Sequence, residues 1–121
     1  TVLASYNQSC CITGLKNPLL LQASHIVGWK QDEANRTNPE NGLCLNTLFH
    51  KAYDDNLIGI SPDYEILISE RFFGERPLGV PEETRKYVLG FNHKKIILPR
   101  RFLPNRDLLA QHYEHFCHNV V

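Results

Sequence analysis

Alternating apolar and polar residues stand out in LLLQASHIV, residues 19–27, a β-favouring run that follows the turn signal Asn17-Pro18. This pattern predicts a first strand over residues 19–27. The apolar run GLCL predicts a second, shorter strand over residues 42–45. The polar segment between the two strands is about a dozen residues long, and loops of that length in compact domains are often functional.

A helix is predicted directly after the second strand. Asn46 is a favourable N-cap residue for a helix over residues 47–55. Two short strands, residues 57–60 and 65–69, are predicted next, because the turn sequence SPDY separates two apolar runs. The predicted apolar face of the helix consists of Leu48, Phe49, Ala52 and Tyr53.

The C-terminal half predicts irregular structure that ends in a long helix. Residues 70–92 are rich in Gly, Pro and charged residues, around a short predicted helix at 81–87, and KKIIL at 94–98 predicts another strand. Asn105 predicts the start of a last helix over 106–118. The apolar face of this helix consists of Leu108, Leu109, His112, Tyr113 and Phe116. The chain opens with a short apolar stretch, interpreted as the tail of a helix, and the whole pattern predicts an α+β fold.

Length and composition indicate one domain with a modest core. The chain has 121 residues, of which 42% are hydrophobic, and no apolar run approaches the length of a membrane-spanning helix. Cys10, Cys11, Cys44 and Cys117 form no C-x-x-C pair, so neither a structural zinc site nor a disulfide framework is expected. We therefore expect a cytoplasmic protein with reduced thiols. The absence of Met suggests a fragment of a longer protein.

Charge is unevenly distributed along a chain whose formal net charge is zero. Residues 84–106 contain seven Lys and Arg residues and no acid, while the other residues hold six basic and thirteen acidic side chains. A basic segment on an acidic body is typical of proteins that bind a polyanion. A solvated loop or strand edge rich in Lys and Arg explains the same pattern, and the sequence leaves both interpretations open.

Candidate chemistry gathers in residues 25–54. His50 and Asp54 lie one turn apart on the predicted helix, away from its apolar face, so they could bind a divalent ion or form an ordinary surface pair. His25 interrupts the first strand, either as a base or as a half-exposed filler residue. Asn41 precedes Gly42, where its amide could hold a loop closed or simply favour a turn.

Together, His25 in SHI, Asn41 in NPENGL and His50 in LFHKAYD resemble the HNH family of nucleases, also called ββα-metal or His-Me finger nucleases. This resemblance implies a β-hairpin and a helix around one divalent ion, with extra short strands and a C-terminal helix. His25 would be the general base, Asn41 would brace the loop that carries it, and His50 with Asp54 would bind the metal.

The flanking motifs C-x-x-T-G and A-S-H-I are similar to the subgroup found in restriction-type endonucleases. The resemblance covers residues 10–69 well and the extension 70–121 more loosely. It implies that residues 1–121 form a single nuclease domain that cuts double-stranded DNA. A DNA-recognition domain would then precede it in the full protein, and a homodimer would make both cuts in a duplex.

The sequence departs from the family at Ser24, where many members carry an Asp or His that binds the metal. A hydroxyl is a poor ligand for a divalent ion, so His50, Asp54, water and substrate oxygens would have to hold it. Mg²⁺ is the expected ion, with Mn²⁺, Ni²⁺ and Zn²⁺ left open. The row His112, His115 and His118 could form a second metal site, or His112 could pack at the edge of the core.

Basic residues near these motifs are candidates for contacts with the DNA backbone, which give affinity without reading the base sequence. These candidates are Lys30, Arg36, Lys51, Lys94, Lys95, Arg100 and Arg101. Two alternatives to a restriction enzyme stay open. One is an effector or toxin that degrades nucleic acid with little sequence specificity, and the other is a nucleic-acid-binding module that has lost catalysis.

Overall fold

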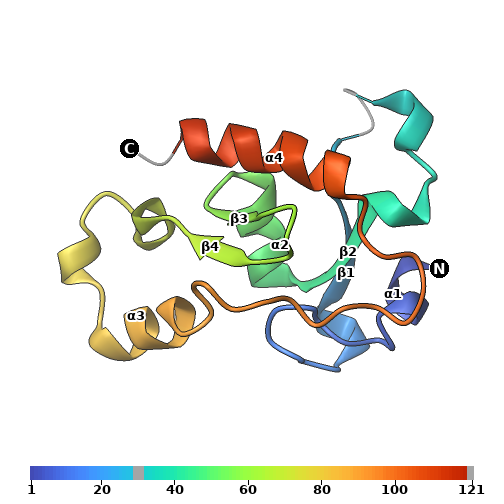
Figure 1. The fold of residues 1–121 in the computed structure, drawn as a ribbon. Helices are drawn as coiled ribbons and strands as arrows, with labels where there is room; N and C mark the ends of the chain where they lie inside the picture. Colours follow the sequence, from blue (N-terminus) through green and yellow to red (C-terminus); the bar gives the residue numbers. More distant parts are fainter. Residues whose placement is uncertain (29–31, 120–121) are drawn as a thin grey trace.

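A computed structural model describes residues 1–28 and 32–119 and confirms the α+β class (Figure 1). Its centre is a two-stranded antiparallel sheet followed by a helix. In this sheet β1 (Leu21–His25) pairs with β2 (Gly42–Asn46), with His25 opposite Gly42 at one end and Leu21 opposite Asn46 at the other. Helix α2 (Thr47–Asp54) follows β2 without a break, because the Asn46 side chain accepts a hydrogen bond from the Phe49 N–H and caps it.

A second antiparallel pair supports the far side of α2. Strand β3 (Ile58–Ile60) pairs with β4 (Ile66–Ile68), and the long helix α4 (Arg106–His118) packs across β3. The approach of α4 to β3 is close, since a Cβ atom placed on Gly59 would lie 2.6 Å from the ring of Phe116. The remaining helices are α1 (Val2–Ser5) and α3 (Glu82–Leu89), with short 3₁₀ turns η1 (Pro18–Leu20), η2 (Glu33–Asn35), η3 (Pro39–Asn41), η4 (Glu70–Phe73) and η5 (Pro77–Gly79).

The core forms where these elements meet. All five residues of β2 are buried, and α2 contributes Phe49, Ala52 and Tyr53. Helix α4 closes the core with Leu108, Leu109 and Phe116, three of the five residues predicted for its apolar face. Both α2 and α4 pack against the core through these apolar residues. Polar side chains beside these residues therefore lie between the two helices.

Several expectations were wrong in detail. The first strand, predicted over residues 19–27, spans only Leu21–His25, because residues 18–20 form the turn η1. KKIIL is not a strand, since only Lys95 forms an isolated bridge, with Glu65. The backbone N–H groups of this segment bond in different directions, Ile96 to the Tyr64 carbonyl and Ile97 to the Cys11 carbonyl, so no continuous ladder forms. Leu48 was expected in the core but is 51% exposed, because it lies about a quarter turn from the centre of the buried face of α2.

Candidate functional site

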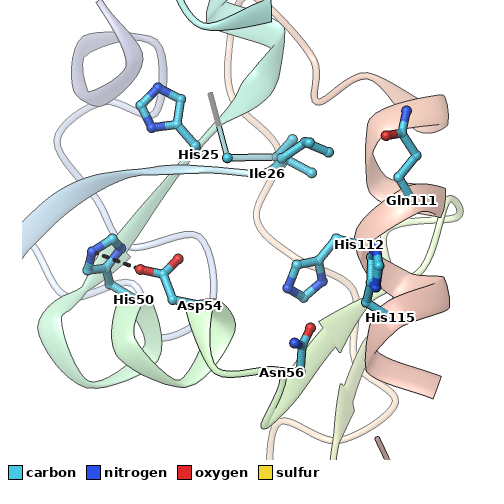
Figure 2. Close-up of a pocket in the computed structure, with 10 residues that line it drawn as sticks. His25, Ile26, His50, Asp54, Asn56, Gln111, His112 and His115 are labelled. Atoms are coloured by element: carbon cyan, nitrogen blue, oxygen red, sulfur yellow. Dashed lines mark ion pairs between the residues drawn. The ribbon is translucent and has the colours of Figure 1, made fainter. Parts of the chain in front are cut away.

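A cleft of about 440 Å³ lies between the end of β1, helix α2 and helix α4. Figure 2 shows its side chains. His25, His50 and Asp54 line the cleft on one side, and α4 lines it on the other. The side chains that α4 contributes are Gln111, His112 and His115.

His50 and Asp54 lie together on α2 as their spacing predicts. The Nε2 atom of His50 is 3.5 Å from Oδ2 of Asp54, and both side chains are partly exposed to the cleft. The Nδ1 atom of His50 is buried and has no hydrogen-bond partner among the described residues. Nε2 is therefore the nitrogen of His50 that can bind a metal ion or a substrate in the cleft.

His25 stands at the exposed end of β1, and a backbone carbonyl orients its ring. Its Nε2 lies 3.2 Å from the carbonyl oxygen of Arg36. Because a carbonyl oxygen only accepts, Nε2 carries the proton and Nδ1 keeps a free lone pair. Figure 2 shows the ring extending away from the His50–Asp54 pair, although all three residues line the same cleft.

Asn41 holds the loop between β1 and β2 closed. Its side chain is fully buried, and its Oδ1 accepts a hydrogen bond of 2.9 Å from the Val27 N–H. Its Nδ2 donates to two carbonyl oxygens, those of Val27 at 3.0 Å and Asn35 at 3.1 Å. Since Asn35 directly precedes Arg36, the amide of Asn41 fixes the backbone beside the carbonyl that orients His25.

Ser24 is fully buried, and its Oγ atom has no hydrogen-bond partner among the described residues. In residues 1–28 and 32–119, no group of three or more His, Cys, Asp or Glu side chains is placed to hold a metal ion. The residues expected to bind a metal thus supply one imidazole and one carboxylate, from His50 and Asp54.

His112 joins α4 to α2 instead of contributing to a metal cluster. Its ring stacks on Tyr53, with 3.6 Å between ring centroids and 7° between planes, and its Nε2–H donates to the Tyr53 carbonyl at 2.7 Å. The pKa of His112 is lowered from 6.5 to about 4. Burial is the main cause, the hydrogen bond to the Tyr53 carbonyl opposes it, and nearby His115 adds to the lowering.

This buried imidazole leads us to expect a loss of stability in acid. The folded state resists protonating His112 while the unfolded chain protonates it near pH 6.5, so its contribution to stability is complete above about pH 6.5 and declines as pH falls toward 4. The loss attributable to His112 should be about 3 kcal/mol over that window. His112→Gln keeps a donor for the Tyr53 carbonyl without a titrating group. Urea unfolding at pH 7 and pH 4.5 should therefore show a smaller acid loss in this variant, and an equal loss in both proteins contradicts the assignment.

The predicted basic contacts are spread over several surfaces. None of Lys94, Lys95, Arg100 and Arg101 lines the cleft, and the Lys95 ammonium donates to the Asp63 carbonyl. Lys51 forms an ion pair with Asp55 one turn along α2. Arg36 lines a neighbouring groove that shares His25 with the cleft. Lys30 lies outside the described residues.

Comparison with known families finds a match to less than half of the chain. Residues 10–61 match the HNH endonuclease family. This HNH segment, residues 10–61, contains β1, β2, α2 and β3, together with His25, Asn41, His50 and Asp54. A search among curated proteins found no match. No helix in the described part of the chain is long and apolar enough to cross a membrane.

The HNH segment does not account for the whole cleft. Helix α4, residues 106–118, lies outside the matched range and yet forms one wall of it. The sequence predicts the α4 histidines as a row on one helix, and their spacing does not indicate that they lie near His50. The only available signal was the concentration of polar residues in QHYEH, between the apolar positions of an otherwise core-packed helix.

Proposed function

We propose that this chain is a metal-dependent endonuclease that hydrolyses phosphodiester bonds of double-stranded DNA. The observation that carries the proposal is the cleft that His25, His50 and Asp54 line together, all within the HNH segment. A cleft lined by one imidazole and by an imidazole–carboxylate pair suits phosphodiester hydrolysis. One imidazole takes a proton from the attacking water, and the imidazole–carboxylate pair can bind a cation that stabilises the negative charge on the phosphate.

His25 acts as the general base through its Nδ1 atom. With Nε2–H donated to the Arg36 carbonyl, Nδ1 is the nitrogen free to accept a proton from the attacking water, and the carbonyl stabilises the imidazolium that results. Because the ring extends away from the helix pair, the DNA strand must lie over the end of β1. In this arrangement the attacking water would approach from the His25 side, and a non-bridging phosphate oxygen would face His50 and Asp54.

His50 and Asp54 fit the requirements of a divalent ion. Two ligands of one octahedral ion at about 2.1 Å lie about 3 Å apart, close to the 3.5 Å between His50 Nε2 and Asp54 Oδ2. Bound there, the ion would stabilise the charge that develops on the phosphate oxygens during hydrolysis. Mg²⁺ is our first candidate, and the imidazole ligand makes Mn²⁺, Ni²⁺ and Zn²⁺ reasonable alternatives.

The biological role we propose is DNA cleavage in a restriction system, supported by the flanking motifs C-x-x-T-G and A-S-H-I. One observation favours a second candidate, a module that binds nucleic acid without cutting it. Ser24 is buried where a further metal ligand is expected, and the described residues contain no group of three or more His, Cys, Asp or Glu side chains placed to hold an ion. Such a module would bind DNA equally well with and without divalent ions and cut under neither condition.

Plasmid cleavage with a panel of divalent ions tests the proposal. We expect nicking and linearisation with at least one ion and none in excess EDTA. Asp54→Ala should raise the ion concentration needed for half-maximal cleavage by roughly 10- to 100-fold, because half of the protein ligand set is lost. The matched control is Asp55→Ala, since Asp55 is the next carboxylate on the chain and pairs with Lys51. If both variants shift the ion requirement equally, Asp54 is not a ligand.

A further inference from the structure

We infer that α4 supplies a second substrate-binding wall, in which Gln111 and His115 donate hydrogen bonds to the phosphodiester backbone of the DNA held in the cleft. The inference rests on the proposed function and extends it beyond the HNH segment. The two residues lie one turn apart on α4, so they share one face of the helix. Both line the cleft on the side opposite His25, His50 and Asp54, as Figure 2 shows.

The chemistry of these two side chains suits a phosphate. Gln111 and His115 are exposed, and within the described residues no hydrogen bond or ion pair engages either side chain. An amide N–H and an imidazole N–H are both donors that non-bridging phosphate oxygens accept. Among the described residues that line the cleft, Asp54 is the only carboxylate and four are histidines, so the wall opposite α2 does not repel an anion.

His112 fixes the position of this wall relative to the hydrolytic residues. Its hydrogen bond to the Tyr53 carbonyl and its stacking on the Tyr53 ring attach α4 to α2 at the residue directly before Asp54. Gln111 and His115 flank this attachment along the helix. Their donors are therefore held at a set distance across the cleft, which is what a site needs if it is to bind the backbone on both sides of the reacting phosphate.

The test measures binding separately from cleavage. In a His25→Ala background, DNA is retained without being cut, and fluorescence anisotropy with a labelled duplex and Mg²⁺ gives Kd. Adding Gln111→Ala and His115→Ala should weaken binding by roughly tenfold or more, because the loss of even one hydrogen bond to a charged group accounts for about tenfold. His118→Ala is the matched control, because His118 is exposed on the same helix and does not line the cleft. Alanine favours helices, so thermal melting should be unchanged.

A tenfold loss in the double variant with an unchanged His118→Ala protein supports the inference. Equal Kd values in the double variant and its parent overturn it, as does an equal loss in His118→Ala, which would indicate a general charge effect of the helix. The failure of the proposed function looks different. In that case the otherwise unmodified chain cuts no plasmid with any ion. If this inference alone fails, the unmodified chain cuts plasmid and the α4 substitutions leave Kd unchanged.

Discussion

Replacing His25 by Ala should lower the rate of DNA cleavage by roughly 10²- to 10⁴-fold, the contribution expected of a positioned general base. The side chain is exposed at the end of β1 and, within residues 1–28 and 32–119, makes one hydrogen bond, to the Arg36 carbonyl, so its removal should leave the fold intact. Initial rates of plasmid linearisation at saturating divalent ion give the loss. Circular dichroism and thermal melting of the same preparation should show no difference from the parent.

Two controls separate a base from a structural histidine. His118→Ala removes an exposed imidazole elsewhere and should cut at the parental rate. His25→Gln keeps a side-chain donor for the Arg36 carbonyl but has no basic nitrogen, so it should be nearly as inactive as His25→Ala. A His25→Gln protein that cuts normally would mean that position 25 only orients the loop, and the base would have to be another group.

Local signals in the sequence were sufficient for the hairpin, for α2 and for α4. Alternation in LQASH, the N-caps Asn46 and Asn105 and the spacing of His50 and Asp54 all act within a few residues. The structure reproduces α4 with the predicted bounds and ends α2 one residue earlier than expected. Interactions within a turn of helix or along one strand depend little on the rest of the molecule, and this is why the sequence predicts them.

Features that depend on long-range packing were not predictable in this way. A bracing role for Asn41 was expected from the resemblance, but its partners at residues 27 and 35 depend on the path of the loop. The position of α4 beside α2 depends on His112 meeting Tyr53, which is 59 residues away in sequence. KKIIL has the composition of a strand, but its backbone N–H groups donate to the carbonyls of Tyr64 and Cys11, which lie in different parts of the fold. Propensity alone carries no information about such partners.

Replacing Asn41 is expected to damage stability and cleavage together. Asn41→Ala would remove the hydrogen-bond partner of the Val27 N–H and of the Val27 carbonyl, and would open a cavity where a fully buried side chain now lies. The Asn35 carbonyl would lose one of its two hydrogen bonds and keep the one from the Asn38 N–H. We expect a loss of about 3 kcal/mol in the free energy of unfolding, measured by urea denaturation, because each buried unsatisfied polar group costs about 1–3 kcal/mol and water can reach part of the loop.

Asn41→Asp separates the two amide functions, because it has nearly the same shape and so leaves no cavity. Its carboxylate can still accept from the Val27 N–H, but it cannot donate to the two carbonyls and places negative charge beside them. If the donors brace the loop, Asn41→Asp should lose at least as much stability as Asn41→Ala. In protein that is still folded, it should also cut DNA more slowly, because the Arg36 carbonyl no longer holds His25 in one orientation. A folded Asn41→Asp protein with parental cleavage would show that the loop needs no brace.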